Sequence, residues 1–312
     1  MRSIGDDQWV DLSDYRFCVR KWENPSTVEA QATATQDASS WKSWPYPILW
    51  LHGFMGSVHD WDAVVNEWGD RPSCIAIDLP GHGKTDVTGT EEQYAMPSTA
   101  QGIVQLLDAL DIRRCGLVGY SMGGRLALYL ALQYPERFCC VALESASPGL
   151  HTANEQDTRR TNDAALAQTL LSINFEQFIE QWYQQPLFAS LNQHLSFPSV
   201  MNRRLRNDPN LLARSLQWMG TGQQSSLWDA LGKSTTPLLL IVGEHDAKYR
   251  QIASEIGDRH PNCTIATVPN CGHTVHVEQP TQFLAHIRTF VQTSFASNLS
   301  ISHDSAAPQR SE

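Results

Sequence analysis

The chain has 312 residues, of which 41% are hydrophobic and 18% are charged, and its formal net charge is -10. This composition is typical of a globular protein with a sizeable core, and it excludes an intrinsically disordered chain. The negative charge argues against nucleic acid or an anionic membrane as the partner, because binding to either requires a surplus of Lys and Arg.

The seven cysteines are odd in number and lie mostly in apolar runs. A free thiol in such a run behaves as a small hydrophobic group, so we expect no disulfide framework and a reducing compartment. The N-terminus lacks the apolar stretch of a signal peptide, and no run reaches the length of about 18 apolar residues that a membrane span needs. We therefore expect a cytoplasmic protein without membrane insertion.

Short apolar runs alternate along the chain with segments of helical period. This alternation predicts an α/β fold with a mostly parallel sheet and helices on both faces. In chain order, we expect edge strands within 10–20, strands at 48–51, 74–77, 116–118, 138–143, 237–242 and 264–268, and helices at 60–68, 98–110, 122–134, 250–259 and 280–293.

The strand rhythm stops between residues 149 and 232, where the pattern predicts helices at 157–171, 175–183 and 211–218. An all-helical block between two strands of a parallel sheet indicates a cap. The predicted organisation is therefore a core of residues 1–148 and 233–296 with a helical cap at 149–232. Two polar segments complete the chain, a flexible loop at 24–45 and a disordered tail at 297–312.

The segment Gly119-Tyr120-Ser121-Met122-Gly123 matches the pattern G-x-S-x-G between an apolar strand and a helix. This context predicts a nucleophile elbow, a sharp turn that exposes the serine and requires small neighbours. The Met122 N–H then lies at a helix N-terminus, where it can face a developing negative charge. The alternative is a glycine-rich turn whose serine caps the helix.

A second N–H donor for such a charge is expected after an earlier strand. The segment His52-Gly53-Phe54 follows the run ILWL, and the Phe54 N–H is the candidate for this oxyanion hole. The alternative is a plain turn from strand to helix. The segment Asp78 to Gly83 follows another strand, and its Pro and Gly residues indicate a structural turn at the rim of the site.

An acid and a histidine should follow the serine along the chain. Asp246 and His273 each lie just past the end of a predicted strand, so both can reach the sheet edge that carries Ser121. The competing acid is Glu244. His245 and His276 are the competing imidazoles, but these three positions fit the strand ends less well.

A metal site and a cysteine nucleophile are two alternatives to the triad. His273, His276 and Glu278 contain metal-ligating groups, but their spacing places them on a loop without a further ligand cluster, so we expect no metal. Cys271 lies beside the histidine and is expected to be a packing thiol rather than a nucleophile.

From about residue 47 to 291, these segments resemble the α/β-hydrolase family. That scaffold is shared by esterases, thioesterases, carbon-carbon hydrolases, lyases and receptors, so it does not define the reaction. The predicted cap contains six arginines and no lysine. Arginine suits bidentate recognition of carboxylates, although any of the six could instead solvate a helix surface.

The chain also resembles a narrower family, the 2-succinyl-6-hydroxy-2,4-cyclohexadiene-1-carboxylate synthases of menaquinone and phylloquinone biosynthesis. The resemblance rests on LHGFMGSVHDW, DLPGHG, VGYSMGGR, SPGL, GEHDAKYR, CGHTVHVEQP and above all WYQQPLFASLN in the variable cap. It implies a lyase that eliminates pyruvate from a substrate with three carboxylates. The triad serine would act as a general base, and no cofactor would be needed.

The resemblance further implies a set of substrate-binding residues. These are Tyr120, Arg125, Arg159, Trp182 and Arg206, with Arg203 or Arg204 as replacements for Arg206. Two other classes of function stay open. One is an esterase, thioesterase or carbon-carbon hydrolase that uses Ser121 as a nucleophile, and the other is a ligand-binding protein without turnover.

Overall fold

The computed structural model describes residues 5–23, 44, 46–69 and 71–304, with side chains up to Ser294. The predicted flexible loop at 24–45 lies outside these residues except for Trp44. Among the described residues, no helix combines the length and apolar character that a membrane span requires.

The described strands form one nine-stranded sheet with the order β1-β2-β4-β3-β6-β7-β8-β9, and β5 pairs with β2. Strands β3 to β9, other than β5, pair in parallel, whereas β1, β2 and β5 form the antiparallel edge. The strands are β1 (Asp6–Asp11), β2 (Tyr15–Trp22), β3 (Ile48–Leu51), β4 (Cys74–Ile77), β5 (Asp86–Val87), β6 (Cys115–Tyr120), β7 (Phe138–Glu144), β8 (Leu238–Gly243) and β9 (Cys263–Val268).

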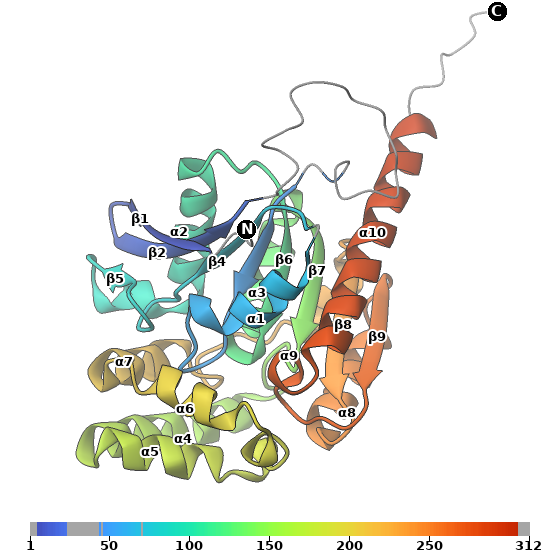
Figure 1. Cartoon of the computed structure of the whole chain (residues 1–312). Helices are drawn as coiled ribbons and strands as arrows, with labels where there is room; N and C mark the ends of the chain where they lie inside the picture. Colours follow the sequence, from blue (N-terminus) through green and yellow to red (C-terminus); the bar gives the residue numbers. More distant parts are fainter. Residues whose placement is uncertain (1–4, 24–43, 45, 70, 305–312) are drawn as a thin grey trace, which may run out of the picture.

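Helices cover both faces of the sheet, as expected (Figure 1). Each face of the sheet has an apolar cluster that the helices cover. In β3, alternate side chains point to opposite faces, so Leu49 and Leu51 belong to one cluster and Ile48 and Trp50 to the other. The first cluster includes α2 (Met96–Ala109), α3 (Ser121–Gln133) and α8 (Ala247–Gly257). The second includes α1 (Asp62–Glu67) and α10 (Pro280–Asp304).

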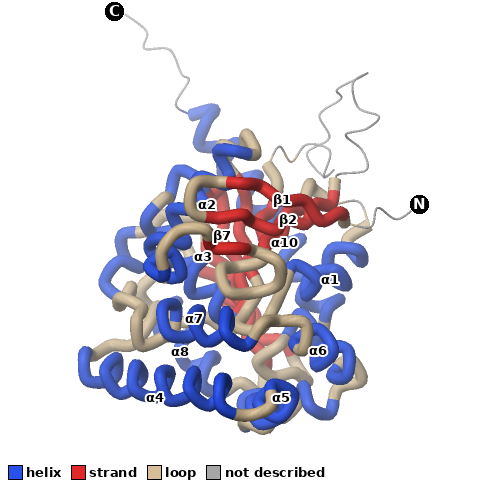
Figure 2. Tube along the Cα trace, turned by 90° about the vertical axis from the view of Figure 1, so that its left-hand side faces the viewer, coloured by secondary structure: helices blue, strands red, loops and turns tan. Residues whose placement is uncertain are grey.

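The segment between β7 and β8 contains four α-helices within the described residues, and we call residues 149–232 the cap. Its helices are α4 (Ala153–Ser172), α5 (Phe175–Tyr183), α6 (Phe197–Arg204) and α7 (Pro209–Met219). Figures 1 and 2 both show them gathered at one end of the sheet. They share an apolar cluster of their own that includes Phe178, Val200 and Leu212. The cap is therefore a packed layer over the sheet edge.

Most predicted elements differ from the structure by a few residues at their ends, and three differences concern the cap and the C-terminal segment. Helix α4 begins four residues before the predicted start, because Thr152 and Glu155 form a capping box. The short helix α6 was not predicted. Helix α10 continues to Asp304, so the first part of the predicted disordered tail is helical, and residues 305–312 lie outside the described part.

Candidate active site

Ser121 lies at a sharp turn between β6 and α3, with φ = 50°. A side chain is rarely tolerated at this φ, so the neighbouring residues must allow a close approach of strand and helix. A Cβ atom at Gly119 would lie 2.5 Å from the Gly123 carbonyl oxygen, and one at Gly123 would lie 2.4 Å from the carbonyl oxygens of Leu51 and His52. This geometry matches a nucleophile elbow.

In the predicted triad, His273 lies within hydrogen-bonding distance of both Ser121 and Asp246. His273 Nε2 is 3.2 Å from Ser121 Oγ, and His273 Nδ1 is 2.7 Å from Asp246 Oδ2. The other carboxylate oxygen of Asp246 accepts a hydrogen bond from the Tyr249 N–H at the start of α8. The carboxylate therefore holds the proton on Nδ1 and leaves Nε2 free to accept the serine proton.

The competing residues have other surroundings. Glu244 and His245 are exposed, and the Glu244 carboxylate accepts a hydrogen bond from the Asn270 N–H. His276 is buried and bonds through Nδ1 to Glu144 at 2.8 Å. No group of three or more His, Cys, Asp or Glu residues in the described part of the chain could hold a metal ion.

The loop that carries His273 is held by two buried carboxylates that sequence reasoning did not assign. Glu278 accepts hydrogen bonds from the N–H groups of Gly272 and Thr274, and Glu144 accepts one from the N–H of His276. Alternate amides on both sides of His273 are thereby fixed. Glu278 lies only six residues after Gly272, in the run GHTVHVE, so this contact is local in the sequence. No signal in the sequence links the His273 loop to Glu144.

We expect Glu144→Gln to lower the free energy of unfolding by about 1.5–3 kcal/mol, the usual contribution of a hydrogen bond to a charged group. The amide keeps the shape of the side chain but loses the charge that faces His276. Urea denaturation measures this effect. Glu92→Gln, an exposed and matched change, should leave the urea midpoint unaltered, and equal stability of the two variants would contradict the prediction.

The proposed oxyanion donors belong to residues that line the same cavity as Ser121, namely Phe54 and Met122. The turn before Phe54 is held by His52. This buried imidazole accepts a hydrogen bond from the Leu79 N–H at Nε2 and therefore donates from Nδ1 to the Gly53 carbonyl oxygen at 2.7 Å. Burial lowers the pKa of His52, which keeps the ring neutral in this role.

The cavity at Ser121 has a volume of about 180 Å³ and extends between the sheet edge and the cap. Three of the predicted substrate-binding residues line it, Arg125, Arg159 and Trp182. Sequence reasoning missed Lys248, which also lines it and follows Asp246 by two positions. Lysine in GEHDAKYR was visible in the sequence, but only the start of α8 places it at the cavity.

Arg125 is 8% exposed and lies one turn into α3. Its guanidinium donates to the Gln224 side-chain oxygen at 2.9 Å and to the Met219 carbonyl oxygen at 2.8 Å. Both acceptors are neutral. Burial lowers the pKa of Arg125 to about 10, so the group stays charged at neutral pH. The cavity thus contains a buried cation that no described carboxylate pairs with.

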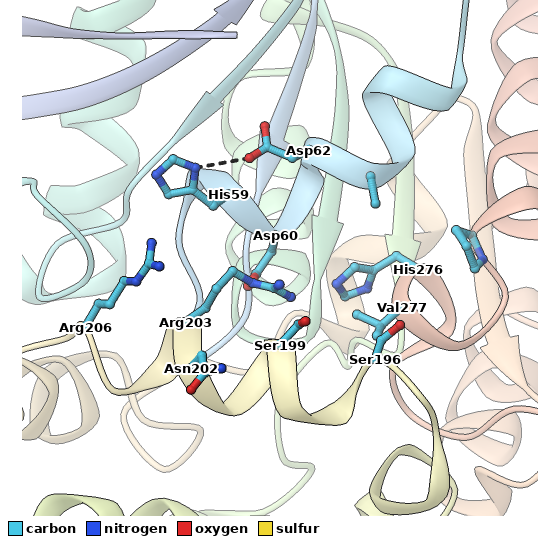
Figure 3. A pocket seen from close by; sticks show the side chains of 12 residues that line it. His59, Asp60, Asp62, Ser196, Ser199, Asn202, Arg203, Arg206, His276 and Val277 are labelled. Atoms are coloured by element: carbon cyan, nitrogen blue, oxygen red, sulfur yellow. Dashed lines mark hydrogen bonds and ion pairs between the residues drawn. The ribbon is translucent and has the colours of Figure 1, made fainter. Parts of the chain in front are cut away.

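Two predicted substrate-binding residues do not line this cavity. Tyr120 is buried behind the elbow, where its ring contacts the rings of His273 and His276. Arg206 instead lines a separate cavity beside His276 (Figure 3). Arg206 lies there because a buried aspartate of the core binds the two arginines at the end of α6.

That aspartate is Asp60, whose side chain is 1% exposed. Arg204 Nη1 lies 2.8 and 2.7 Å from its two oxygens, and Arg203 Nε donates to it at 2.9 Å. Neither replacement residue for Arg206 is therefore available at Ser121, since both connect the cap to the core. The neighbouring arginines hold the pKa of Asp60 far below its usual range despite burial.

The family model of the alpha/beta hydrolase fold matches residues 46–280, and with the elbow and triad described above this means that the chain belongs to the α/β-hydrolase fold family. A protein of Bacillus subtilis (strain 168), provisionally named as a 2-succinyl-6-hydroxy-2,4-cyclohexadiene-1-carboxylate synthase, is 40% identical over 239 residues, which cover 76% of this chain and 86% of that protein. The chain therefore belongs, within the fold, to the family of these synthases.

Two further comparisons agree with this assignment. The 2-succinyl-6-hydroxy-2,4-cyclohexadiene-1-carboxylate synthase of Enterobacter sp. (strain 638) is 34% identical over 237 residues, or 75% of this chain and 86% of that protein. The solved structure of MenH from S. aureus is 29% identical, with a TM-score of 0.78, and the match covers 91% of this chain and 99% of that one.

Proposed function

We propose that the protein is a carbon-oxygen lyase that eliminates pyruvate from 2-succinyl-5-enolpyruvyl-6-hydroxy-3-cyclohexene-1-carboxylate and forms 2-succinyl-6-hydroxy-2,4-cyclohexadiene-1-carboxylate. The synthase relatives support the reaction. We infer an anionic substrate from one observation. The buried guanidinium of Arg125 lines the cavity of the reactive serine and has no carboxylate partner among the described residues. A buried charge of this kind is costly unless a bound anion compensates it.

In the proposed mechanism, His273 Nε2 takes the proton of Ser121 Oγ, and the serine oxygen takes the proton from the ring carbon next to the succinyl ketone. The electron pair of that C–H bond forms an enolate, whose oxygen accepts hydrogen bonds from the N–H groups of Phe54 and Met122. Through the ring double bond, these electrons expel the enolpyruvyl oxygen. The departing enolate takes the proton that His273 Nε2 carries and becomes pyruvate, and the conjugated diene remains.

The cations of the cavity match the charges of this substrate. Arg125 and Lys248 can each bind a carboxylate of the substrate. Arg159 donates from Nε to Asp163 at 2.7 Å, so its terminal nitrogens are left to bind a ligand. The cavity of about 180 Å³ is smaller than the usual range of about 300–1,000 Å³ for small-molecule sites. Access of the whole substrate therefore requires a shift of cap segments.

Release of pyruvate tests the function directly. With the enolpyruvyl substrate and a lactate dehydrogenase coupling enzyme, we expect steady loss of NADH absorbance that is the same with and without chelator. No release above background would overturn the proposal. An ester or thioester hydrolase using Ser121 as nucleophile is the alternative, favoured by the intact triad; an acyl-enzyme found by mass spectrometry with p-nitrophenyl esters or acyl-CoA would support it.

Removal of Arg159 is expected to raise KM more than it lowers kcat. If Arg159 holds a remote carboxylate equally in ground and transition states, Arg159→Ala weakens binding uniformly by roughly 1.5–3 kcal/mol, which is about 10- to 150-fold in KM. Pyruvate release at varied substrate concentration measures both constants. Arg214→Ala, which removes an exposed cap arginine that pairs with Glu91 at 3.6 Å, is the control. An unchanged KM in Arg159→Ala would contradict its placement.

We also propose that the enzyme works in the cytoplasm. Its seven cysteines are all free, and six of them are buried, which supports a reducing compartment.

A further inference from the structure

A second cavity, of about 590 Å³, lies between the cap and the core. Its walls are α6, the 3-10 helix Val58–Trp61 with the start of α1, and α9 (Val275–Glu278). It shares no lining residue with the cavity at Ser121. Its volume falls within the range of about 300–1,000 Å³ for small-molecule sites, and the proposed reaction makes no use of it.

One wall carries a row of hydrogen-bond donors. Ser196, Ser199, Arg203 and Arg206 all line the cavity. They follow one another at intervals of three and four residues, which puts them on the same side of α6 and of the turn after it. Figure 3 shows Arg203 and Ser199 rising from α6 toward Asp60 and His276, with Arg206 beside them on the side of His59. The opposite side of α6 packs into the cap through Val200.

The charge that remains open in this cavity is positive. Both oxygens of Asp60 are taken by Arg204, and one of them also by Arg203 Nε. Asp62 accepts from Arg20 Nε at 2.7 Å. In contrast, the Arg206 side chain makes no ion pair with any described residue, and the terminal nitrogens of Arg203 stay unbonded within the described part.

The opposite wall contains a buried polar atom without a partner. His276 lines the cavity, is 2% exposed, and bonds through Nδ1 to Glu144. Its Nε2 atom has no hydrogen-bond partner among the described residues. Buried polar atoms in native proteins are nearly always paired with protein, water or ligand, so this ring nitrogen retains an unused hydrogen-bonding capacity beside the cavity.

We propose that this cavity is a second, non-catalytic site that binds a small oxyanion, a carboxylate or a phosphate. Both anions offer the two adjacent oxygens that a guanidinium fork binds in bidentate fashion, and Arg203 and Arg206 supply two such forks. Ser199 adds a neutral donor, and the His276 side chain also lines this space. The site is independent of the lyase reaction, since its residues do not contact the cavity at Ser121.

Isothermal titration of the full chain tests the proposal, with succinate in one series and inorganic phosphate in the other. Succinate could also bind at Arg159, so three matched arginine changes are compared: Arg206→Gln at the second cavity, Arg159→Gln at the cavity of Ser121, and Arg214→Gln on the cap surface. We expect Arg206→Gln to lower the affinity for at least one anion by about ten-fold or more. In Arg159→Gln and Arg214→Gln, the second cavity should still bind that anion with wild-type affinity.

The anion that responds to Arg206→Gln identifies the ligand as a carboxylate or a phosphate. Ser199→Ala, an exposed position where folding is not at risk, should weaken the same anion. The proposal is overturned if Arg206→Gln binds both anions as wild type does, if all binding disappears in Arg159→Gln, or if neither anion binds the wild-type chain. Because no turnover is measured, these outcomes are separate from failure of the lyase assay.

Discussion

Replacement of Ser121 by alanine is expected to lower kcat for pyruvate release by about 10²- to 10⁴-fold, the usual contribution of a positioned general base. The change removes only the hydroxyl that lies 3.2 Å from His273 Nε2. The alanine Cβ fits where the serine Cβ already lies, so the thermal midpoint should stay close to that of wild type.

The double variant Ser121→Ala/His273→Ala provides a sharper form of this test. Residues that act as a unit show strongly non-additive effects, so the double variant should be no slower than the worse single variant by more than a few-fold. Ser254→Ala, an exposed serine on α8, serves as the control. If Ser121→Ala retained wild-type kcat, or if the two losses simply multiplied, the serine and histidine would not be acting together as proposed.

Arg204→Ala is expected to destabilise the protein by about 3–5 kcal/mol, the range for breaking a buried ion pair. Arg204 is 2% exposed, binds both oxygens of Asp60 and also donates to the Tyr183 hydroxyl at 3.0 Å. Its loss leaves the Asp60 carboxylate buried with only Arg203 to compensate it. Urea or thermal unfolding measures the effect, and Arg214→Ala should unfold like the wild type.

The same ion pair makes stability depend on pH. The arginines hold the pKa of Asp60 far below its usual range, so the folded state retains the carboxylate charge at pH values where the unfolded chain, with a pKa of about 3.9, becomes protonated. The stabilisation by Asp60 is therefore complete above about pH 4 and declines as the pH falls below that value. In Asp60→Asn, the part of the stability loss at low pH that comes from Asp60 should be missing. If the free energy of unfolding depended on pH in the same way in wild type and Asp60→Asn, the assignment would be contradicted.

Much of the core could be predicted from the sequence because its signals are local. The strands at 48–51 and 74–77 have the same bounds in the structure, since continuous apolar runs between turn residues have few alternatives in a parallel sheet. The elbow is equally local, because glycines at 119 and 123 are needed wherever a strand turns sharply into a helix around Ser121.

The cap was predicted less well for two physical reasons. Helix α4 is polar along its length, with only Asp163, Ala167 and Leu170 buried, so no apolar face marks its first turn. Helix α6 has eight residues, too few for a clear helical period. The Thr152 to Glu155 capping box was the one local signal that could have placed the start of α4.

The sequence by itself determined the fold class, and it predicted the elbow at Ser121 and the acid and histidine after it, because each depends on residue types at short spacing. Only the tertiary structure decided what the cap arginines do. Arg159 lines the cavity of the triad, whereas Arg203 and Arg204 neutralise Asp60, which lies more than a hundred residues away in the chain, and Arg206 faces a different cavity. The partner of a charge is set by which surfaces fold together, and spacing along a helix does not reveal it.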